Sequence, residues 1–354
     1  MTVYINKVFF IFLLLFYSFF LFAQKEDIKN TNILKEIVYT LASDSMLGRA
    51  AGSEGEERAE NYLVSYYKKI GLVALNDSYI KKFKFPKDST HTASAMNVIG
   101  MLDNKAPSTI VIGAHYDHIG MGGPKSRSLT SNKIHNGADD NASGVAMMLM
   151  LAEHLKKSKI KNQKSDKFNY LFIAFSAHED GLYGSQAFVD EKIYDLSKVK
   201  LFLNLDMVGR LDTINPMLKV MRNDHEKYLD SILYKLTKDE FNLIITEDKT
   251  QTDASAFINN NIPSVSFTTG IHDDYHKISD DSEKINYYGM NEITKYIRRV
   301  IASFESYKLK IIPATRNIIE RPEPYAKMPE VKIDENANPN IDKKILENEM
   351  KINN

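Results

Sequence analysis

Residues 109–144 read TIVIGAHYDHIGMGGPKSRSLTSNKIHNGADDNASG, and this stretch decides the predicted fold. The apolar run at 109–112 is typical of a buried strand, which would lead into the motif HYDH at 115–118. A glycine-rich loop then carries the pair Asp139-Asp140 to the start of a predicted helix. The stretch therefore places two clusters of metal-binding residue types in loops at one edge of a sheet, and packing alone does not explain them.

The rest of the chain alternates between predicted strands and predicted helices. We expect strands at residues 109–114, 169–176, 200–206 and 264–268, and helices at 142–157, 183–190, 224–240 and 288–307. This order, with nearly continuous apolar strands, predicts an α/β fold with a mostly parallel central sheet and helices on both faces. In such sheets, binding sites form at the carboxyl ends of the strands.

Histidine and acidic residues follow these strands, as that rule requires. The second strand leads into His178 and Glu179, the third ends at Asp206, and the last leads into a loop that carries His276. Six of the nine histidines lie in loops of this kind: His115, His118, His135, His178, His272 and His276. Surface histidines would be scattered along the chain, so we interpret this concentration as a functional site.

The composition narrows the classes of partner and of site. The chain has 354 residues, with 46 Lys and Arg against 46 Asp and Glu, so its charge gives no reason to expect nucleic acid or an anionic membrane surface as a partner. It contains no cysteine, so a metal site must consist of imidazole and carboxylate ligands. Such ligands suit Zn²⁺ and, less selectively, Mn²⁺ or Co²⁺.

The first 23 residues predict a secretory signal peptide. Lys7 precedes an apolar run at 8–22, and the small residue Ala23 comes shortly before charged residues. A retained membrane anchor is the alternative, but such anchors usually need about 17–25 apolar residues. We therefore expect cleavage near Ala23, export to the periplasm or the medium, and no stable membrane insertion afterwards.

Two further segments follow the predicted signal peptide. Residues 24–312 are expected to form a single α/β domain, because the strand and helix pattern runs through them without a break. Residues 313–354 are rich in Pro, Glu, Lys and Asn and show no sustained periodicity. We expect this last segment to be a polar, weakly structured tail.

The loops after the strands supply enough ligands for two metals. Two metals held about 3.5–4 Å apart need a carboxylate that bridges them, together with a histidine and a further carboxylate for each metal. The chain offers two histidines and three carboxylates: His115, Asp139, Glu179, Asp206 and His276. Asp117, two residues after His115, is well placed to hold the other nitrogen of that imidazole.

These motifs resemble the co-catalytic dizinc exopeptidases of the bacterial leucyl aminopeptidase and glutamate carboxypeptidase type. The matching motifs are GAHYD (113–117), GADDNASG (137–144), EDGLYGS (179–185), LDMVG (205–209) and DYH (274–276). The resemblance spans about residues 34–306, and five motifs in this order are far more specific than any one alone. It implies a phosphorylase/hydrolase-like aminopeptidase fold and a single metallopeptidase domain at 24–312.

The resemblance also implies the ligands, the metals and the reaction. One zinc ion would bind His115, Asp139 and Asp206, and the other would bind Asp139, Glu179 and His276, so that Asp139 bridges them. A water molecule between the two metals would attack the N-terminal peptide bond of a peptide with a free N-terminus. The implied protein is a secreted dizinc aminopeptidase.

One departure from the family pattern concerns the general base. In the family a second Glu directly precedes the ligand Glu and takes the proton of the water, whereas this chain has His178 before Glu179. A histidine can act as a base, because its pKa is about 6.5 and a nearby metal favours its neutral form. His178 could instead bind a metal or fill space. A shifted register, with Glu179 as base and Asp180 as ligand, would require a one-residue deletion.

Other readings remain open on the sequence alone. Relatives often have Ser-Asp-His where this chain has Thr252-Asp253-Ala254, which leaves the substrate preference undetermined. A glutaminyl-cyclase-like acyltransferase shares the fold but uses one zinc ion, and the presence of both His115 and Asp206 favours two. A non-catalytic homologue that keeps its metals is the third reading, because of His178.

Overall fold

The computed structural model describes residues 24–306 except 88–89, 130–131, 163–166, 224–227, 238–239 and 249–251. The chain divides into two units, Met1–Lys308 and Leu309–Asn354, and the described residues belong to the first. The expected signal peptide at 1–23 and the expected tail at 313–354 lie outside the described residues, so both stay predictions. Within the described residues, no helix has the length and apolar character needed to cross a membrane.

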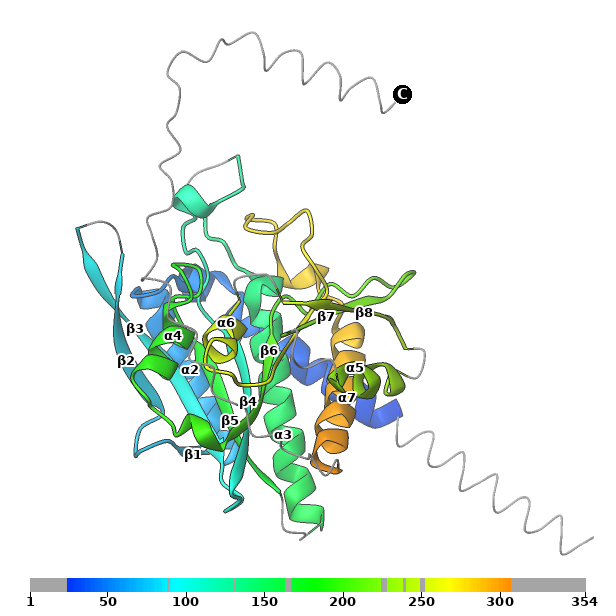
Figure 1. Ribbon diagram of the computed structural model, residues 1–354. Helices are drawn as coiled ribbons and strands as arrows, with labels where there is room; N and C mark the ends of the chain where they lie inside the picture. Colours follow the sequence, from blue (N-terminus) through cyan, green and yellow to red (C-terminus); the bar gives the residue numbers. More distant parts are fainter. Residues whose placement is uncertain are drawn as a thin grey trace, which may run out of the picture. The chain divides into compact units, whose positions relative to one another are not determined.

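A nine-stranded sheet forms the centre of this unit, in the order β1-β3-β5-β4-β6-β9-β7-β8, with β2 paired to β3 (Figure 1). The strands are β1 Val73–Ala74, β2 Ile80–Pro86, β3 Thr92–Leu102, β4 Ser108–His115, β5 Phe168–Phe175, β6 Val199–Leu205, β7 Met217–Arg222, β8 Asn242–Glu247 and β9 Ser264–Thr268. The four neighbouring strands β5, β4, β6 and β9 are parallel to one another. On either side, β3 and β7 pair with this group in the antiparallel sense. The predicted α/β fold is therefore confirmed, and its parallel part is the centre of the sheet.

Helices cover both faces of the sheet. They are a helix over residues 24–41, α2 Glu54–Ile70, α3 Gly144–Asn162, α4 Tyr183–Asp190, α5 Tyr228–Lys235, α6 Ala254–Ile258 and α7 Tyr287–Ser306. Helix α3 packs on β4, β5 and β6, with α7 beside it, whereas α4 packs on β2 and β3 and α6 packs on β6 and β9. A 3-10 helix, η1 Asp44–Arg49, precedes α2.

An aromatic cluster that includes Phe257 of α6 packs against β4 at Gly113. The rings of Phe202 and Phe257 stack with centroids 3.9 Å apart, and the ring of Phe175 meets Phe257 edge-on at 6.2 Å. A Cβ atom at Gly113 would lie 2.5 Å from the Phe175 ring and 2.8 Å from the Phe202 ring, so only glycine fits there. The strand can therefore lie flat on this cluster, two residues before His115.

Candidate metal centre

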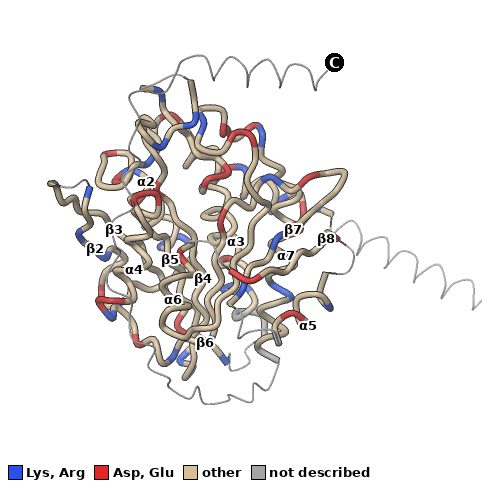
Figure 2. The backbone as a smooth tube through the Cα atoms, turned by 45° about the horizontal axis from the view of Figure 1, so that its top comes forward, with Lys and Arg blue, Asp and Glu red and all other residues tan. Residues whose placement is uncertain are grey.

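The residues that follow the parallel strands meet at one edge of the sheet. His115 ends β4, His178 and Glu179 follow β5, Asp206 follows β6, and His276 lies in the loop after β9. The central strands themselves carry few charged positions, whereas charged positions are frequent in the surrounding loops (Figure 2). The rule that sites form at the carboxyl ends of parallel strands therefore holds in this fold.

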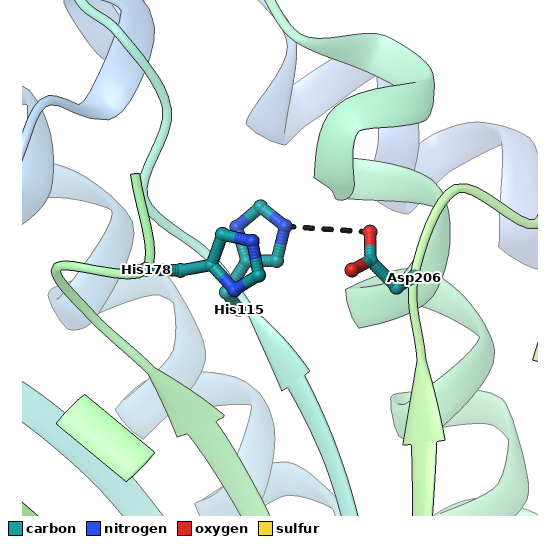
Figure 3. A group of neighbouring side chains, drawn as sticks. All are labelled: His115, His178 and Asp206. Carbon is teal, nitrogen blue, oxygen red and sulfur yellow. Dashed lines mark ion pairs between the residues drawn. The ribbon is translucent and has the colours of Figure 1, made fainter. Parts of the chain in front are cut away.

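His115 faces two carboxylates with one of its nitrogens. Its Nε2 atom lies 3.3 Å from Oδ1 of Asp140 and 3.5 Å from Oδ1 of Asp206, the pair joined by a dashed line in Figure 3. Its Nδ1 atom lies 3.1 Å from the backbone carbonyl oxygen of Asp117, which can only accept a hydrogen bond. Nδ1 must therefore carry a proton, which leaves Nε2 as the atom that would bind a metal beside these carboxylates.

A second group of ligands lies on the other side of Asp140. Nε2 of His276 is 3.2 Å from Oδ2 of Asp140 and 3.2 Å from Oε2 of Glu179. Nδ1 of His276 donates to the backbone carbonyl of Lys125 at 3.0 Å, so Nε2 is again the atom that would bind a metal. Asp140 thus presents one carboxylate oxygen to each of the two groups.

The expectation that Asp139 would hold this central position requires correction, because Asp140 occupies it. Oδ1 of Asp139 accepts hydrogen bonds from Ser143 Oγ at 2.9 Å and from the backbone N–H of Gly209 at 2.6 Å, and its Oδ2 lies 3.1 Å from Nε2 of His272. The backbone leaves helical geometry at Asp140, with φ −106° and ψ 88°. The two neighbouring carboxylates therefore point to different places, and Asp139 fixes the start of the helical segment.

The role of Asp117 differs from the predicted one, in which it holds the second nitrogen of the His115 ring. Its backbone carbonyl oxygen accepts the hydrogen bond from Nδ1 of His115 at 3.1 Å. Its carboxylate does not, because Oδ1 lies 3.7 Å from that nitrogen. The carboxylate accepts hydrogen bonds from the backbone N–H groups of His178 at 3.1 Å and of Glu179 at 3.2 Å. Burial raises the pKa of Asp117 to about 7, against the opposing effect of His115 and His178. Asp117 therefore holds in place the loop that carries Glu179.

His178 lies against His115 with its ring parallel to it. The ring centroids are 3.7 Å apart, at an angle of 10° (Figure 3). Nδ1 of His178 lies 2.9 Å from Oδ2 of the fully buried Asp253, directly before α6. Burial and His115 lower the pKa of His178, but Asp253 and Asp206 outweigh them and raise it to about 9. A nitrogen of His178 also lies within 4.8 Å of ligand atoms of both His115 and Asp206.

His118 also faces the site, although it was not among the predicted ligands. It is buried, and its Nδ1 atom lies 3.2 Å from Oε1 of Glu179 and 3.7 Å from Oδ2 of Asp140. Its nitrogen forms a group with those two carboxylates in which all ligand atoms lie within 4.8 Å of one another. The sequence did contain an indication that His118 lies at the site, because His118 is the last residue of the HYDH motif.

The positions of the polar atoms in the site suit metal coordination better than hydrogen bonding among these atoms. Three atoms that face the two ligand groups are among the buried atoms without a hydrogen-bond partner in the described residues: Nε2 of His115, Nε2 of His276 and Oδ2 of Asp140. Two ligands of one tetrahedral zinc ion, bound at about 2.0–2.2 Å, are about 3.3–3.6 Å apart. The contacts of 3.2–3.5 Å made by His115 and His276 match that spacing. Each imidazole and its carboxylates therefore converge on a common point.

The charges of the site favour cations. Burial raises the pKa of Glu179, as does the charge of Asp140, but the neighbouring imidazoles of His118 and His276 outweigh both and lower it to about 2. Asp140 has its pKa held well below the ordinary value by His115 and His276, in spite of burial. Both carboxylates are therefore ionised at neutral pH and provide negative charge for a metal.

One buried cation belongs to the framework around the site. Arg49 is fully buried, and its guanidinium donates to the backbone carbonyls of Tyr116 at 2.8 Å, Leu41 at 2.5 Å, Asn136 at 2.7 Å and Gly137 at 2.9 Å. Burial lowers the pKa of Arg49 to about 10, which still leaves it charged at neutral pH. Arg49 therefore joins the segment before α2 to both loops that carry ligands.

Comparison with known proteins gives a family for this chain. The sequence pattern of peptidase family M28 matches residues 97–301, more than half of the 354 residues. The matched segment contains every candidate ligand from His115 to His276.

Curated relatives share parts of the sequence. The chain is 28% identical over 166 residues to the alkaline phosphatase isozyme conversion protein of Escherichia coli. The aligned segment covers 45% of this chain and 46% of that protein. It is 24% identical over 233 residues to a probable leucine aminopeptidase of Arthroderma otae. That aligned segment covers 62% of this chain and 59% of the relative. The chain thus spans about half the length of these two relatives.

Solved structures share the fold. A Zn-dependent exopeptidase from Parabacteroides distasonis superposes with a TM-score of 0.63 at 17% identity, over 77% of this chain and 97% of that one. A glutaminyl cyclase from Bacteroides thetaiotaomicron, bound to N-acetylhistamine, gives a TM-score of 0.62 at 17% identity and the same coverage. At such identities the likeness shows the α/β fold alone, and the expected fold class is confirmed.

Proposed function

Because the chain belongs to peptidase family M28, we propose that it is an exported zinc aminopeptidase that hydrolyses the N-terminal peptide bond of peptides. The observation that carries this proposal is the arrangement of ligand atoms around Asp140, whose two oxygens serve two separate groups. We assign the first zinc ion to His115, Asp140 and Asp206, and the second to Asp140, Glu179 and His276. Asp140 replaces Asp139 in this assignment.

Different residues of the chain have different roles in the proposed reaction. When bound, two zinc ions supply the Lewis acidity that activates a water molecule and polarises a peptide carbonyl. His178, whose Nδ1 is held by Asp253, takes the proton of that water through Nε2, because the charge of the bound metals would keep its ring neutral against the effect of Asp253 and Asp206. Asp117 keeps His178 and Glu179 in register through their backbone N–H groups. Peptides with a free N-terminus are the proposed substrates, and no nucleic acid or membrane partner is proposed.

The test combines metal analysis with a pair of substitutions at one position. Purified protein supplied with zinc should hold about two zinc ions per chain and release N-terminal residues from small peptides, and a chelator should stop the release. His178→Ala should keep both metals and lose activity. The proposal fails if the wild type takes up no metal. An inert wild type beside an active His178→Glu variant would identify a non-catalytic homologue instead.

A second candidate function is that of a glutaminyl-cyclase-like acyltransferase. The structural likeness to the Bacteroides thetaiotaomicron glutaminyl cyclase favours it at the level of the fold. Against it stands His115, whose Nε2 faces both Asp140 and Asp206 and completes a second ligand group. Cyclisation of a peptide with N-terminal Gln, without release of N-terminal residues, would make this the function.

Export is a separate part of the proposal. It rests on the apolar run at 8–22 and on the small residue Ala23. Expression of the full chain in a bacterial host should deliver a shortened protein outside the cytoplasm, and sequencing its N-terminus should show a start near Gln24. A full-length protein in the membrane fraction would indicate a retained anchor.

A further inference from the structure

His118 has an environment that fixes the direction of its ring. Its side chain is buried, and its backbone N–H donates to the carbonyl of Arg49 at 3.2 Å. The ring lies against Gly137, where a Cβ atom would be 2.6 Å from two ring carbons, and the backbone there has a φ of 56°. Any side chain at Gly137 would displace the ring. The neighbouring backbone is therefore shaped to admit an imidazole at this place.

The two histidines of the second ligand group face the same carboxylates. Nε2 of His276 lies 3.2 Å from Oε2 of Glu179, and Nδ1 of His118 lies 3.2 Å from Oε1, the other oxygen of that carboxylate. Both imidazoles also face Oδ2 of Asp140, at 3.2 Å for His276 and 3.7 Å for His118. The rings meet edge-on, with centroids 5.6 Å apart at 81°. Glu179 is thus enclosed by one imidazole on each side.

We propose that Nδ1 of His118 is an additional ligand of the metal ion that Asp140, Glu179 and His276 hold. This inference rests on the proposed function, and it enlarges the ligand set that the family resemblance implies. Two imidazoles and two carboxylates suit Zn²⁺. The imidazole binds in its neutral form, with the proton on Nε2.

The consequence is a difference between the two metal sites. With His118 bound, the second zinc ion has four protein ligands, whereas the first, with His115, Asp140 and Asp206, has three. Zinc can expand to five ligands, so the second site still has room for the water molecule between the metals. The second zinc ion is therefore retained more tightly than the first.

The simpler role for His118 is a hydrogen bond to Glu179, and one substitution separates the two roles. His118→Asn puts an amide N–H near the place of Nδ1, so the hydrogen bond can persist while the imidazole is lost. X-ray absorption of the two-zinc protein counts the imidazoles bound to zinc. We expect one imidazole fewer per chain in the variant than in the wild type. A hydrogen-bonding role would leave this count unchanged.

Zinc affinity gives a second readout that is independent of activity. Competition with a chromophoric chelator should show one tight and one weaker zinc ion in the wild type, and the tight one should weaken at least about 100-fold in His118→Asn. Loss of a residue that only orients a ligand typically costs about 10–100-fold. His135→Asn is the matched control, because His135 is buried in the same loop and contacts Lys133 and Ser126 instead of the carboxylates. It should match the wild type in both measurements.

The possible results separate this inference from the function on which it rests. A wild type that binds no zinc overturns the proposed function itself. A wild type with two zinc ions and an unchanged imidazole count in His118→Asn overturns the ligand role of His118 and leaves the function standing. An unchanged count with a 10-fold loss of affinity would make His118 a positioning residue for Glu179.

Discussion

At the scale of single residues, Asp140 and Asp139 differ only in their surroundings. Asp140→Asn should lose at least one bound zinc ion, because it removes a charge shared by both ligand groups. Asp139→Asn should keep two zinc ions and lose about 1–3 kcal/mol of unfolding free energy, since it weakens the bonds to Ser143 and Gly209. Zinc analysis and chemical denaturation of both variants check this. Equal metal loss in the two variants would contradict the assignment.

Asp253 is the second residue whose substitution tests the mechanism. Asp253→Asn should lower kcat by about 10²-fold or more and leave KM little changed, because His178 loses the partner that orients it. Steady-state kinetics on one aminoacyl substrate, with zinc content measured in parallel, give the answer. An equal kcat in variant and wild type would exclude His178 as the base.

The sequence predicted which loops meet at the candidate site, but not which side chains face its centre. The place of His115, Glu179, Asp206 and His276 at this edge could be predicted because each follows a strand of the parallel centre. Asp139 and Asp140 could not be told apart, since both precede the same helix and only the irregular backbone between them separates their directions. A pattern along the chain carries no information about such local φ and ψ angles.

At the scale of elements, the packing of α3 against α7 contains a group that titrates. His154 of α3 is buried, and burial, with the charges of Arg298 and Lys157, lowers its pKa from 6.5 to about 4. The unfolded chain therefore binds a proton between about pH 6.5 and pH 4 that the folded chain does not. Stability from the neutral His154 is complete above pH 6.5 and is lost as the pH falls towards 4, by up to about 3 kcal/mol.

A variant that cannot titrate isolates this effect. His154→Gln should lose less unfolding free energy between pH 7 and pH 4.5 than the wild type does, because the variant has no proton to bind at that position. Urea denaturation of both proteins at the two pH values measures the difference. Parallel losses would show that other groups account for the acid sensitivity.

The elements with strong periodicity were predicted well, and the weaker ones were not. The helix at 183–190 and the strand at 264–268 have the predicted bounds. Strands β7 and β8 were missed because they are six residues long and β8 is mostly half-exposed, which leaves no apolar run. The predicted helix at 224–240 ends earlier in the structure, since α5 covers Tyr228–Lys235, and residues 224–227 lie outside the described part of the chain. Pairing with β9 stabilises β7 as a strand, and the sequence of β7 alone does not show this long-range contact.

At the scale of the whole molecule, zinc should contribute to stability. Each ion that binds only the folded state adds about 2.7 kcal/mol when its free concentration is 100 times its Kd. Treatment with a chelator should therefore lower the Tm, and added zinc should restore it. Thermal unfolding followed by circular dichroism measures both steps. A Tm that does not respond would mean that the ionised carboxylates of the site are stabilised without metal.

The buried guanidinium of Arg49 gives the N-terminal segment a thermodynamic link to the metal centre. Arg49 bonds to Leu41 on one side and to Tyr116 and Gly137, beside the ligands, on the other. The helix over 24–41 is in turn attached to α7 through Asp27 and Lys295. A coupling free energy between two events is reciprocal, so if zinc binding orders the ligand loops, it should also tighten the attachment of this segment. Conversely, a partner that pulled the segment away would release metal from a centre it never touches.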